Sequence, residues 1–131
     1  MATTTAAARR DQARRDYDAY LAACPSRMLL DRISDKWVSL VMVALGEGTL
    51  RYSELSRQVA GVSQKMLTQT LRSLERDGLV ERRVTASVPV RVDYSLTPLG
   101  NSLRELMYGV KLWAESHMEE VFVARERYDE R

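Results

Sequence analysis

The apolar residues of this chain recur at helical spacing over most of its length. Between residues 34 and 45 they lie at positions i, i+3, i+4, i+7 and i+8, which predicts a helix that faces a core. The residues of this set are Trp37, Leu40, Val41, Ala44 and Leu45. Ser34 is the expected cap of this helix, and Gly46 and Gly48 are expected to end it.

Two more helices are predicted before this one. Residues 6–21 are rich in Ala, Arg and Asp, with opposite charges four residues apart, which is typical of an exposed helix. Cys24-Pro25 interrupts the pattern, and Ser26 is expected to cap a short helix that runs through Ile33. We expect residues 1–8 to form a disordered tail, so that the ordered domain begins at residue 9.

A short helix, a tight turn and a longer helix are predicted between residues 53 and 76. Ser53 starts the first helix, Ala60-Gly61-Val62 forms the turn, and Ser63 caps the second helix. The expected buried side of the second helix carries Met66, Leu67, Thr70, Leu71 and Leu74. The other side carries Lys65, Thr68, Gln69, Arg72 and Arg76. Gly78 lies where the end of a helix needs a left-handed residue.

The remaining sequence predicts a β-hairpin and one long helix. Residues 79–84 and 90–96 are the expected strands, with a tip at residues 85–89, because apolar and polar residues alternate in the second strand. Residues 49–51 are a possible edge strand. Thr97-Pro98 is typical of a helix start, and we expect the helix to reach about Ala124, before a charged tail that frays over residues 125–131. The predicted fold is mainly α with a small β-hairpin wing, a single winged helix-turn-helix domain over residues 9–124.

Composition narrows the possible classes of function. The chain has 131 residues, 45% of them hydrophobic and 29% charged, as in a globular domain. No apolar run approaches the roughly 18–20 residues that cross a bilayer, and no signal peptide is evident, so we expect a cytoplasmic protein. One cysteine and one histidine exclude an internal disulfide and a multi-histidine metal centre. No nucleophile–base pair, paired acids or phosphate loop is evident. We therefore expect that the protein is not an enzyme and that it binds no metal or cofactor.

Charge is distributed unevenly along the chain. Between Arg51 and Arg91, eight basic and four acidic residues give a net charge of +4, whereas the rest of the chain carries −2. A basic centre favours an anionic partner, although a chance fluctuation of surface charge is the alternative. Only a helix or a two-stranded ribbon fits the major groove of DNA, about 12 Å wide. The predicted order of helix, turn, helix and hairpin therefore favours double-stranded DNA as the partner.

The exposed side of the second helix carries groups that match bases and phosphates. Gln64 and Gln69 are candidate adenine readers, because a primary amide can pair with adenine through two hydrogen bonds. Lys65 and Arg72 are candidates for guanine or phosphate, and Arg91 for a minor groove or the backbone. The predicted DNA contacts are Arg51, Ser53, Ser63, Gln64, Lys65, Thr68, Gln69, Arg72, Arg83 and Arg91. The alternatives are a solvated polar face, a module that binds only proteins, and an RNA partner.

Several ordered blocks resemble a known family. They are C-P-S-R-M-L-L-D-R-I-S-D-K-W (Cys24–Trp37), R-Y-S-E-L (Arg51–Leu55), V-S-Q-K-M-L-T-Q-T-L-R-S-L-E-R-D-G-L-V (Val62–Val80) and V-P-V-R-V-D-Y-S-L-T-P-L-G (Val88–Gly100), with the later Trp113. Together they resemble the HxlR family of bacterial transcriptional regulators, relatives of the MarR group. The resemblance implies a winged-helix homodimer that binds operator DNA, most often as a repressor; some members respond to oxidants, electrophiles or other small molecules. Departures from the family pattern lie at Ser34-Asp35, Thr85, Ser87 and Val90.

The terminal helices carry more apolar surface than a domain of this size is expected to bury. We therefore expect residues 9–23 and 97–124 to form a homodimer interface, which would set two recognition helices about 34–36 Å apart on a palindromic operator. The predicted interface residues are Tyr17, Tyr20, Leu103, Leu106, Met107, Val110, Trp113 and Val121. The alternative is that these helices fold back on their own core.

Cys24 has two interpretations. Free cysteine is among the most buried residue types, which favours a structural thiol. Alternatively, Cys24 precedes a helix whose N-terminus favours a thiolate, with Arg27 nearby, as in a sensor of oxidants or electrophiles. Because the chain has no second cysteine, the sensing routes are alkylation, a mixed thiol adduct or a bond to a partner chain.

Overall fold

The chain divides into two compact units in the computed structural model, which describes residues 5–131. The first unit ends at Asp35, and the second covers Lys36–Arg131. This division differs from the single domain predicted over residues 9–124. The predicted helix-turn-helix and its hairpin both lie in the second unit.

The first unit begins with α1 (Ala6–Ala23). Thr5 caps this helix, because its hydroxyl oxygen accepts a hydrogen bond from the backbone N–H of Ala8 at 3.1 Å. Residues 6–8, which were predicted to belong to a disordered tail, are therefore helical, and residues 1–4 of that tail lie outside the described residues. No side chain of α1 is buried.

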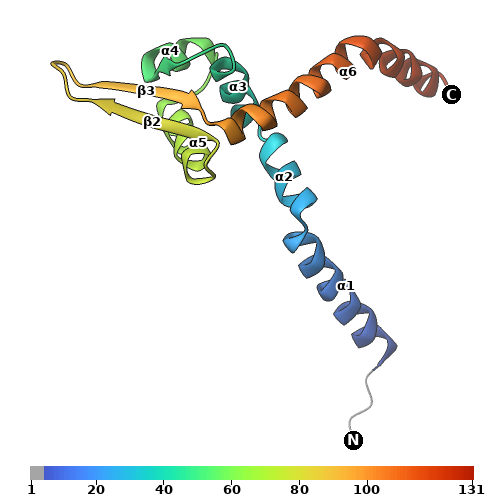
Figure 1. The fold of residues 1–131 in the computed structure, drawn as a ribbon. Coiled ribbons are helices and arrows are strands. Elements are labelled where there is room, and N and C mark those ends of the chain that lie inside the picture. The colour runs from blue at the N-terminus through green and yellow to red at the C-terminus, as the bar shows by residue number, and fades with distance from the viewer. Residues whose placement is uncertain (1–4) are drawn as a thin grey trace, which may run out of the picture. The chain divides into compact units, whose positions relative to one another are not determined.

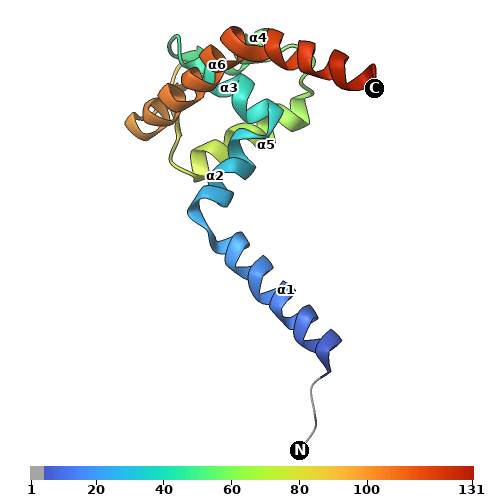
Figure 2. The ribbon, with the colours of Figure 1, turned by 90° about the vertical axis from the view of Figure 1, so that its right-hand side faces the viewer.

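The second helix of this unit, α2 (Pro25–Ile33), follows α1 directly (Figure 2). Pro25 is at its first position, where the fixed φ of proline suits a helix and its missing N–H is no loss. Ser26 lies inside the helix, so its predicted role as the cap is wrong. Ser34 ends α2 and donates its hydroxyl to the carbonyl of Asp31 at 3.3 Å, which corrects its predicted role at the start of the next helix.

The second unit is built around one hydrophobic core. Its helices are α3 (Lys36–Leu45), α4 (Tyr52–Gln58), α5 (Gln64–Arg76) and α6 (Pro98–Asp129). The buried hydrophobic residues are Val38, Val41, Met42, Leu45, Leu55, Val59, Leu67, Leu71, Leu74, Leu79, Val80 and Tyr94. They come from α3, α4, α5 and the sheet, so the core joins both helices of the helix-turn-helix to the hairpin.

The buried face of α3 differs from the predicted one. Val38, Val41, Met42 and Leu45 are buried, whereas Leu40 is 39% exposed and Trp37 is only partly buried. Eight of the ten residues from Lys36 to Leu45 are apolar, so the helical periodicity of the sequence is compatible with several buried faces of this helix. Contacts of α3 with α5, α6 and the sheet select the face that is buried.

A three-stranded antiparallel sheet completes the second unit. Its strands are β1 (Leu50–Arg51), β2 (Val80–Thr85) and β3 (Arg91–Leu96), in the order β1-β3-β2. The β2–β3 hairpin projects beyond α4 and α5, as the predicted wing should (Figure 1). The predicted edge strand is confirmed in β1, which pairs Leu50 with Tyr94.

The connection from α5 into β2 is a tight one. Gly78 has a φ of 75°, the left-handed conformation that was predicted for it. The N–H of Gly78 donates to the carbonyl of Glu75, and the N–H of Leu79 donates to the carbonyl of Leu74, each at 3.0 Å. These two bonds satisfy carbonyls at the helix end and direct the chain into the sheet.

The first turn of α6 packs closely against this connection. The Thr97 hydroxyl accepts the N–H of Gly100 at 3.0 Å and donates to the carbonyl of Gly78 at 2.6 Å, so the predicted helix start is confirmed. The helix continues to Asp129, and residues 125–129 are therefore helical where a frayed tail was predicted. Leu103 and Met107 pack against the core of their own chain.

Candidate nucleic-acid interface

Helix α5 presents one polar face to solvent. Ser63 caps it as predicted, because its hydroxyl oxygen accepts the backbone N–H of Met66 at 3.1 Å. The predicted buried side is confirmed at Leu67, Thr70, Leu71 and Leu74, while Met66 is partly buried. The exposed residues on the other side include Gln64, Lys65, Gln69 and Arg72. This face combines amides and cations, and its first two residues, Gln64 and Lys65, lie at the positive end of the helix dipole.

A tyrosine of α4 holds the first turn of α5. The Tyr52 hydroxyl lies 3.0 Å from the carbonyl oxygen of Gln64, to which it donates, and 3.2 Å from the hydroxyl of Thr68. Thr68 is consequently only partly exposed and is engaged within the unit, although it was predicted as a DNA contact. Sequence reasoning missed Tyr52. Its only signal was its position next to Arg51 at the start of the helix-turn-helix.

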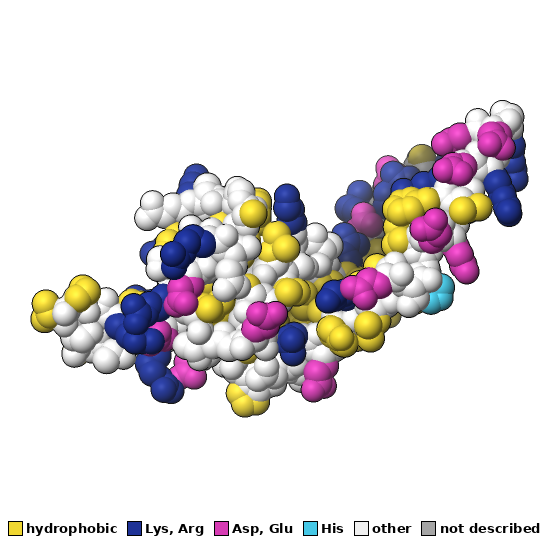
Figure 3. Space-filling model, turned by 90° about the horizontal axis from the view of Figure 1, so that it is seen from above, with side chains coloured by type: hydrophobic (Ala, Val, Ile, Leu, Met, Phe, Trp, Pro, Cys, Tyr) yellow, Lys and Arg dark blue, Asp and Glu magenta, His cyan; other side chains and the backbone are white. Residues whose placement is uncertain are grey.

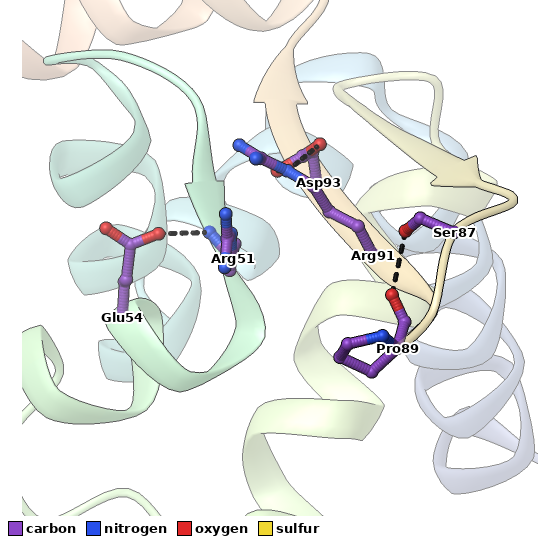
Figure 4. Close-up of polar contacts among 6 residues, drawn as sticks. All are labelled: Arg51, Glu54, Ser87, Pro89, Arg91 and Asp93. Carbon is purple, nitrogen blue, oxygen red and sulfur yellow. Dashed lines mark hydrogen bonds and ion pairs between the residues drawn. The ribbon is translucent and has the colours of Figure 1, made fainter.

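The start of α4 lies beside the wing. The carboxylate of Glu54 accepts the backbone N–H of Arg51 at 3.0 Å (Figure 4). This bond satisfies a backbone donor at the helix end, and the helix begins at Tyr52, one residue before the predicted start at Ser53. Arg51 and Ser53 are both exposed, and together with residues 87–92 of the hairpin they line an open groove of about 560 Å³.

The two faces of the hairpin carry different arginines. Residues that are directly opposed in an antiparallel pair share a face, and successive residues alternate between faces. The register pairs Arg82 with Tyr94 and Arg83 with Asp93. Tyr94 is buried in the core, so Arg82 lies on the core-facing side of the sheet and Arg83 on the outer side.

The arginines on the outer side are engaged with carboxylates of the hairpin itself. The Nε of Arg91 lies 3.0 and 3.1 Å from the two carboxylate oxygens of Asp93 (Figure 4). Arg83 forms an ion pair with Glu81 at 3.3 Å. Both arginines were predicted DNA contacts, and in this structure a phosphate would have to compete with Glu81 for Arg83 and with Asp93 for Arg91.

A second groove separates α5 from the core-facing side of the wing. Its volume is about 550 Å³, and Arg72 of α5 and Arg82 of β2 both line it. Basic side chains gather where the hairpin leaves the body of the unit, as the dark blue atoms of Figure 3 show. Arg82 was not among the predicted contacts, because a strand by itself does not show which of two adjacent arginines faces α5.

Neither a metal site nor a membrane span emerges from the described residues. Over residues 5–131, no three His, Cys, Asp or Glu side chains are grouped so that they could hold a metal ion. No helix in this range combines the length and the apolar character that crossing a bilayer requires.

A stripe of apolar side chains follows α6. Leu106, Val110 and Trp113 were predicted at a dimer interface, and each is more than half exposed in the single chain. Hydrophobic side chains lie along this helix between charged ones (Figure 3). Trp113 stacks on His117 with ring centroids 4.8 Å apart. Two other predicted interface residues, Leu103 and Met107, are used at least in part by the chain's own core.

Tyr17 and Tyr20 of α1 and Val121 of α6 complete the predicted interface set. Tyr17 and Tyr20 are 62% and 69% exposed, and Val121 is partly buried. Among the described residues of the first unit, 5–35, neither tyrosine ring is covered.

Cys24 lies at the junction between α1 and α2. It precedes Pro25 at the start of α2, and its thiol is partly exposed. The backbone N–H groups of Arg27 and then Ser26, at the start of α2, hold the pKa of this thiol below its ordinary value, although partial burial opposes the shift and the thiol forms no capping hydrogen bond with the helix. The folded chain therefore stabilises the thiolate form of Cys24 relative to an ordinary cysteine.

The helix pair α4–α5 followed by the β2–β3 hairpin defines a winged helix-turn-helix protein. The chain belongs to the HxlR-like helix-turn-helix family, whose pattern matches residues 32–122. It is 45% identical over 103 residues to YtfH of Escherichia coli (strain K12), an uncharacterized HTH-type transcriptional regulator, and the match covers 79% of this chain and 82% of YtfH.

Solved structures of regulators have the same fold. The YtfH regulator from Salmonella typhimurium is 42% identical, with a TM-score of 0.70, over 80% of this chain and 94% of that one. The redox regulator HypR in its reduced form is 36% identical, with a TM-score of 0.71, over 76% of this chain and 99% of HypR. These similarities identify the chain as a transcriptional regulator of the HxlR family.

Proposed function

We propose that this regulator is a sequence-specific DNA-binding repressor that acts as a homodimer on a palindromic operator. The observation that carries the proposal is the exposed polar face of α5, which begins at the capped Ser63 and includes Gln64, Lys65, Gln69 and Arg72. This helix enters the major groove, where Gln64 and Gln69 read base edges. Lys65 and Arg72 supply positive charge toward phosphates.

The homodimer follows from the apolar stripe on α6. Leu106, Val110 and Trp113 recur at helical spacing and are exposed in the single chain. A second copy of the same helix buries this stripe through a twofold axis, because an isologous contact pairs each patch with itself. Such an axis presents two α5 helices to successive major grooves on one side of the duplex, and the operator is then a palindrome.

The first prediction tests DNA binding through α5. Replacement of Lys65 by alanine is expected to weaken operator binding and to reduce the slope of log K against log [salt] by about one for each phosphate contact that is lost. Lys111→Ala is the matched control, because this exposed lysine lies on α6 and forms an ion pair with Glu115 at 3.7 Å. Fluorescence anisotropy with an operator selected from random duplexes measures both variants. Equal slopes for the two would remove Lys65 from the contact set.

The competing function is a winged helix that binds only proteins. Anisotropy with random duplex DNA at low salt separates this alternative, since any DNA-binding winged helix should show salt-dependent non-specific affinity there. A wild-type protein that binds neither random duplex nor any selected sequence would contradict the proposed function.

We further propose that Cys24 makes the regulator responsive to oxidants or electrophiles. The supporting observation is the lowered pKa of its thiol at the start of α2, caused by the backbone N–H groups of Arg27 and Ser26. HypR, a structural relative, is itself a redox regulator. A quinone would react by addition of the Cys24 thiolate to an electrophilic ring carbon. The ring C=C electrons move to the carbonyl oxygen, which takes up a proton from solvent in place of the one that the thiol released, and the product is a hydroquinone thioether.

The second prediction concerns the pH dependence of this thiol. In the folded protein, the rate of alkylation by iodoacetamide is expected to reach half its maximum at a lower pH than in the urea-unfolded chain, where the pKa of Cys24 returns to its ordinary value. The folded thiolate is stabilised, so its contribution to stability is complete above the ordinary pKa and is lost as the pH falls through the lowered pKa. Coincident pH profiles would rule out the shift. Cys24→Ser, which leaves no thiol, is the control for labelling and for quinone-induced release of operator DNA.

A further inference from the structure

The groove between α5 and the wing brings together two arginines from different elements. Arg72 lies on the exposed side of α5, and Arg82 lies on the core-facing side of β2. Both line the same open groove of about 550 Å³, and the buried residues Leu71 and Tyr94 lie beneath it. The two cations are therefore held on opposite walls by secondary structure that is anchored in the core.

These two arginines differ from those on the outer side of the wing in their partners. Across the described residues, no hydrogen bond or ion pair engages the guanidinium of Arg72 or that of Arg82. Arg83 and Arg91, in contrast, are paired with Glu81 and Asp93. An unpaired guanidinium in a concave groove favours an anion with several acceptor oxygens, above all phosphate, because its planar set of N–H donors matches two of them at once.

The position and size of the groove favour a phosphate of the DNA backbone over a small free anion. If α5 enters a major groove, as proposed above, a backbone strand that borders that groove has room to run between the helix and the wing, because the groove between them is open. The groove is open to solvent, and its volume is several times that of a single phosphate, which suits a continuous backbone better than a small enclosed ion.

We propose that this groove binds a phosphodiester group of the operator backbone, with Arg82, and not Arg83, as the wing residue that contacts it together with Arg72. The proposal rests on the proposed DNA binding and specifies one of its contacts. Glu75 also lines the groove, one turn after Arg72. Its carboxylate opposes the phosphate, so this glutamate limits the affinity of the site.

Adjacent arginines on opposite faces of β2 provide a matched test. Arg82→Ala is expected to raise the operator Kd about tenfold or more and to reduce the salt slope by about one for each protomer bound. Arg83→Ala removes the same charge from the next residue and is expected to stay within about twofold of wild type. Glu75→Gln is expected to lower the Kd a few-fold, since it removes a negative charge from the groove without removing its volume.

The measurement is anisotropy over a series of KCl concentrations, with circular dichroism and Tm to verify that each variant is folded. Equal losses in Arg82→Ala and Arg83→Ala, or wild-type binding by Arg82→Ala, would overturn the proposal while DNA binding itself stands. A wild-type protein that binds no duplex would overturn both. A further experiment titrates inorganic phosphate into the DNA-free protein. If wild type binds phosphate saturably and Arg82→Ala does not, while Arg82→Ala keeps the wild-type affinity for duplex DNA, the groove would be assigned to a free anion instead.

Discussion

Replacement of Gly100 by alanine is expected to lower the free energy of unfolding by about 2–3 kcal/mol, with a decrease in Tm of about 10 °C. A Cβ at this position would meet the backbone carbonyl oxygen of Leu79 well inside van der Waals contact. The helix cannot simply move away, because the same carbonyl accepts the N–H of Thr97 at 3.1 Å and the Thr97 hydroxyl donates to Gly78 at 2.6 Å. The higher helix propensity of alanine offsets this loss of stability by at most about 1 kcal/mol.

Gly109→Ala provides the control for this experiment. Gly109 lies on the same helix, and a Cβ at that position meets nothing within 4 Å in the protomer. Urea denaturation should therefore show a small gain in stability for Gly109→Ala, of at most about 1 kcal/mol. A Gly100→Ala variant as stable as Gly109→Ala would contradict close packing of α6 against Leu79, in the connection between α5 and β2.

Replacement of Val110 by glutamate is expected to convert the proposed dimer to monomer and to weaken operator binding by about 10²–10⁴-fold. Val110 is 60% exposed and lies between Leu106 and Trp113 in the apolar stripe of α6. Two carboxylates brought together at a twofold interface would be buried without partners, which opposes association. The loss of affinity follows because two half-sites bound by one linked dimer gain an effective concentration that two monomers lack.

Val123→Glu is the matched control for the dimer experiment. Val123 is also exposed on α6, but it is 13 residues from Val110 and, at about 100° per residue, points to a different side of the helix. Sedimentation velocity at a fixed protein concentration reports the oligomeric state, and anisotropy reports operator affinity. A dimeric Val110→Glu protein with unchanged operator binding would exclude this stripe as the interface.

Local interactions made several elements predictable. Ser63 and Thr97 are helix caps, and Gly78 has the left-handed conformation that ends α5. Each of these features depends on backbone groups within a few residues, so the nearby sequence contains all the relevant information. The same reasoning holds for α5, whose polar and apolar residues are cleanly segregated and whose two faces were therefore predicted.

Features that depend on distant neighbours were not predictable in the same way. The start of α5 is bonded to Tyr52, twelve residues before Gln64. On β2, two consecutive arginines have equal propensity and charge, and only the register with β3 and the packing of α5 separate Arg82 from Arg83. The near-continuous apolar sequence of α3 similarly had no preferred buried face before its neighbours were placed.

The sequence by itself determined the order of helices and strands, the caps at Ser63 and Thr97, the turn at Gly78, the polar face of α5 and the resemblance to HxlR regulators. Tertiary structure alone decided the division at Asp35, the buried side of α3, the support of α5 by Tyr52 and the meeting of Arg72 with Arg82 across one groove. The reason is physical. Caps and turns are stabilised by interactions between residues that are close in sequence. A groove exists only after packing and strand register have brought distant segments together.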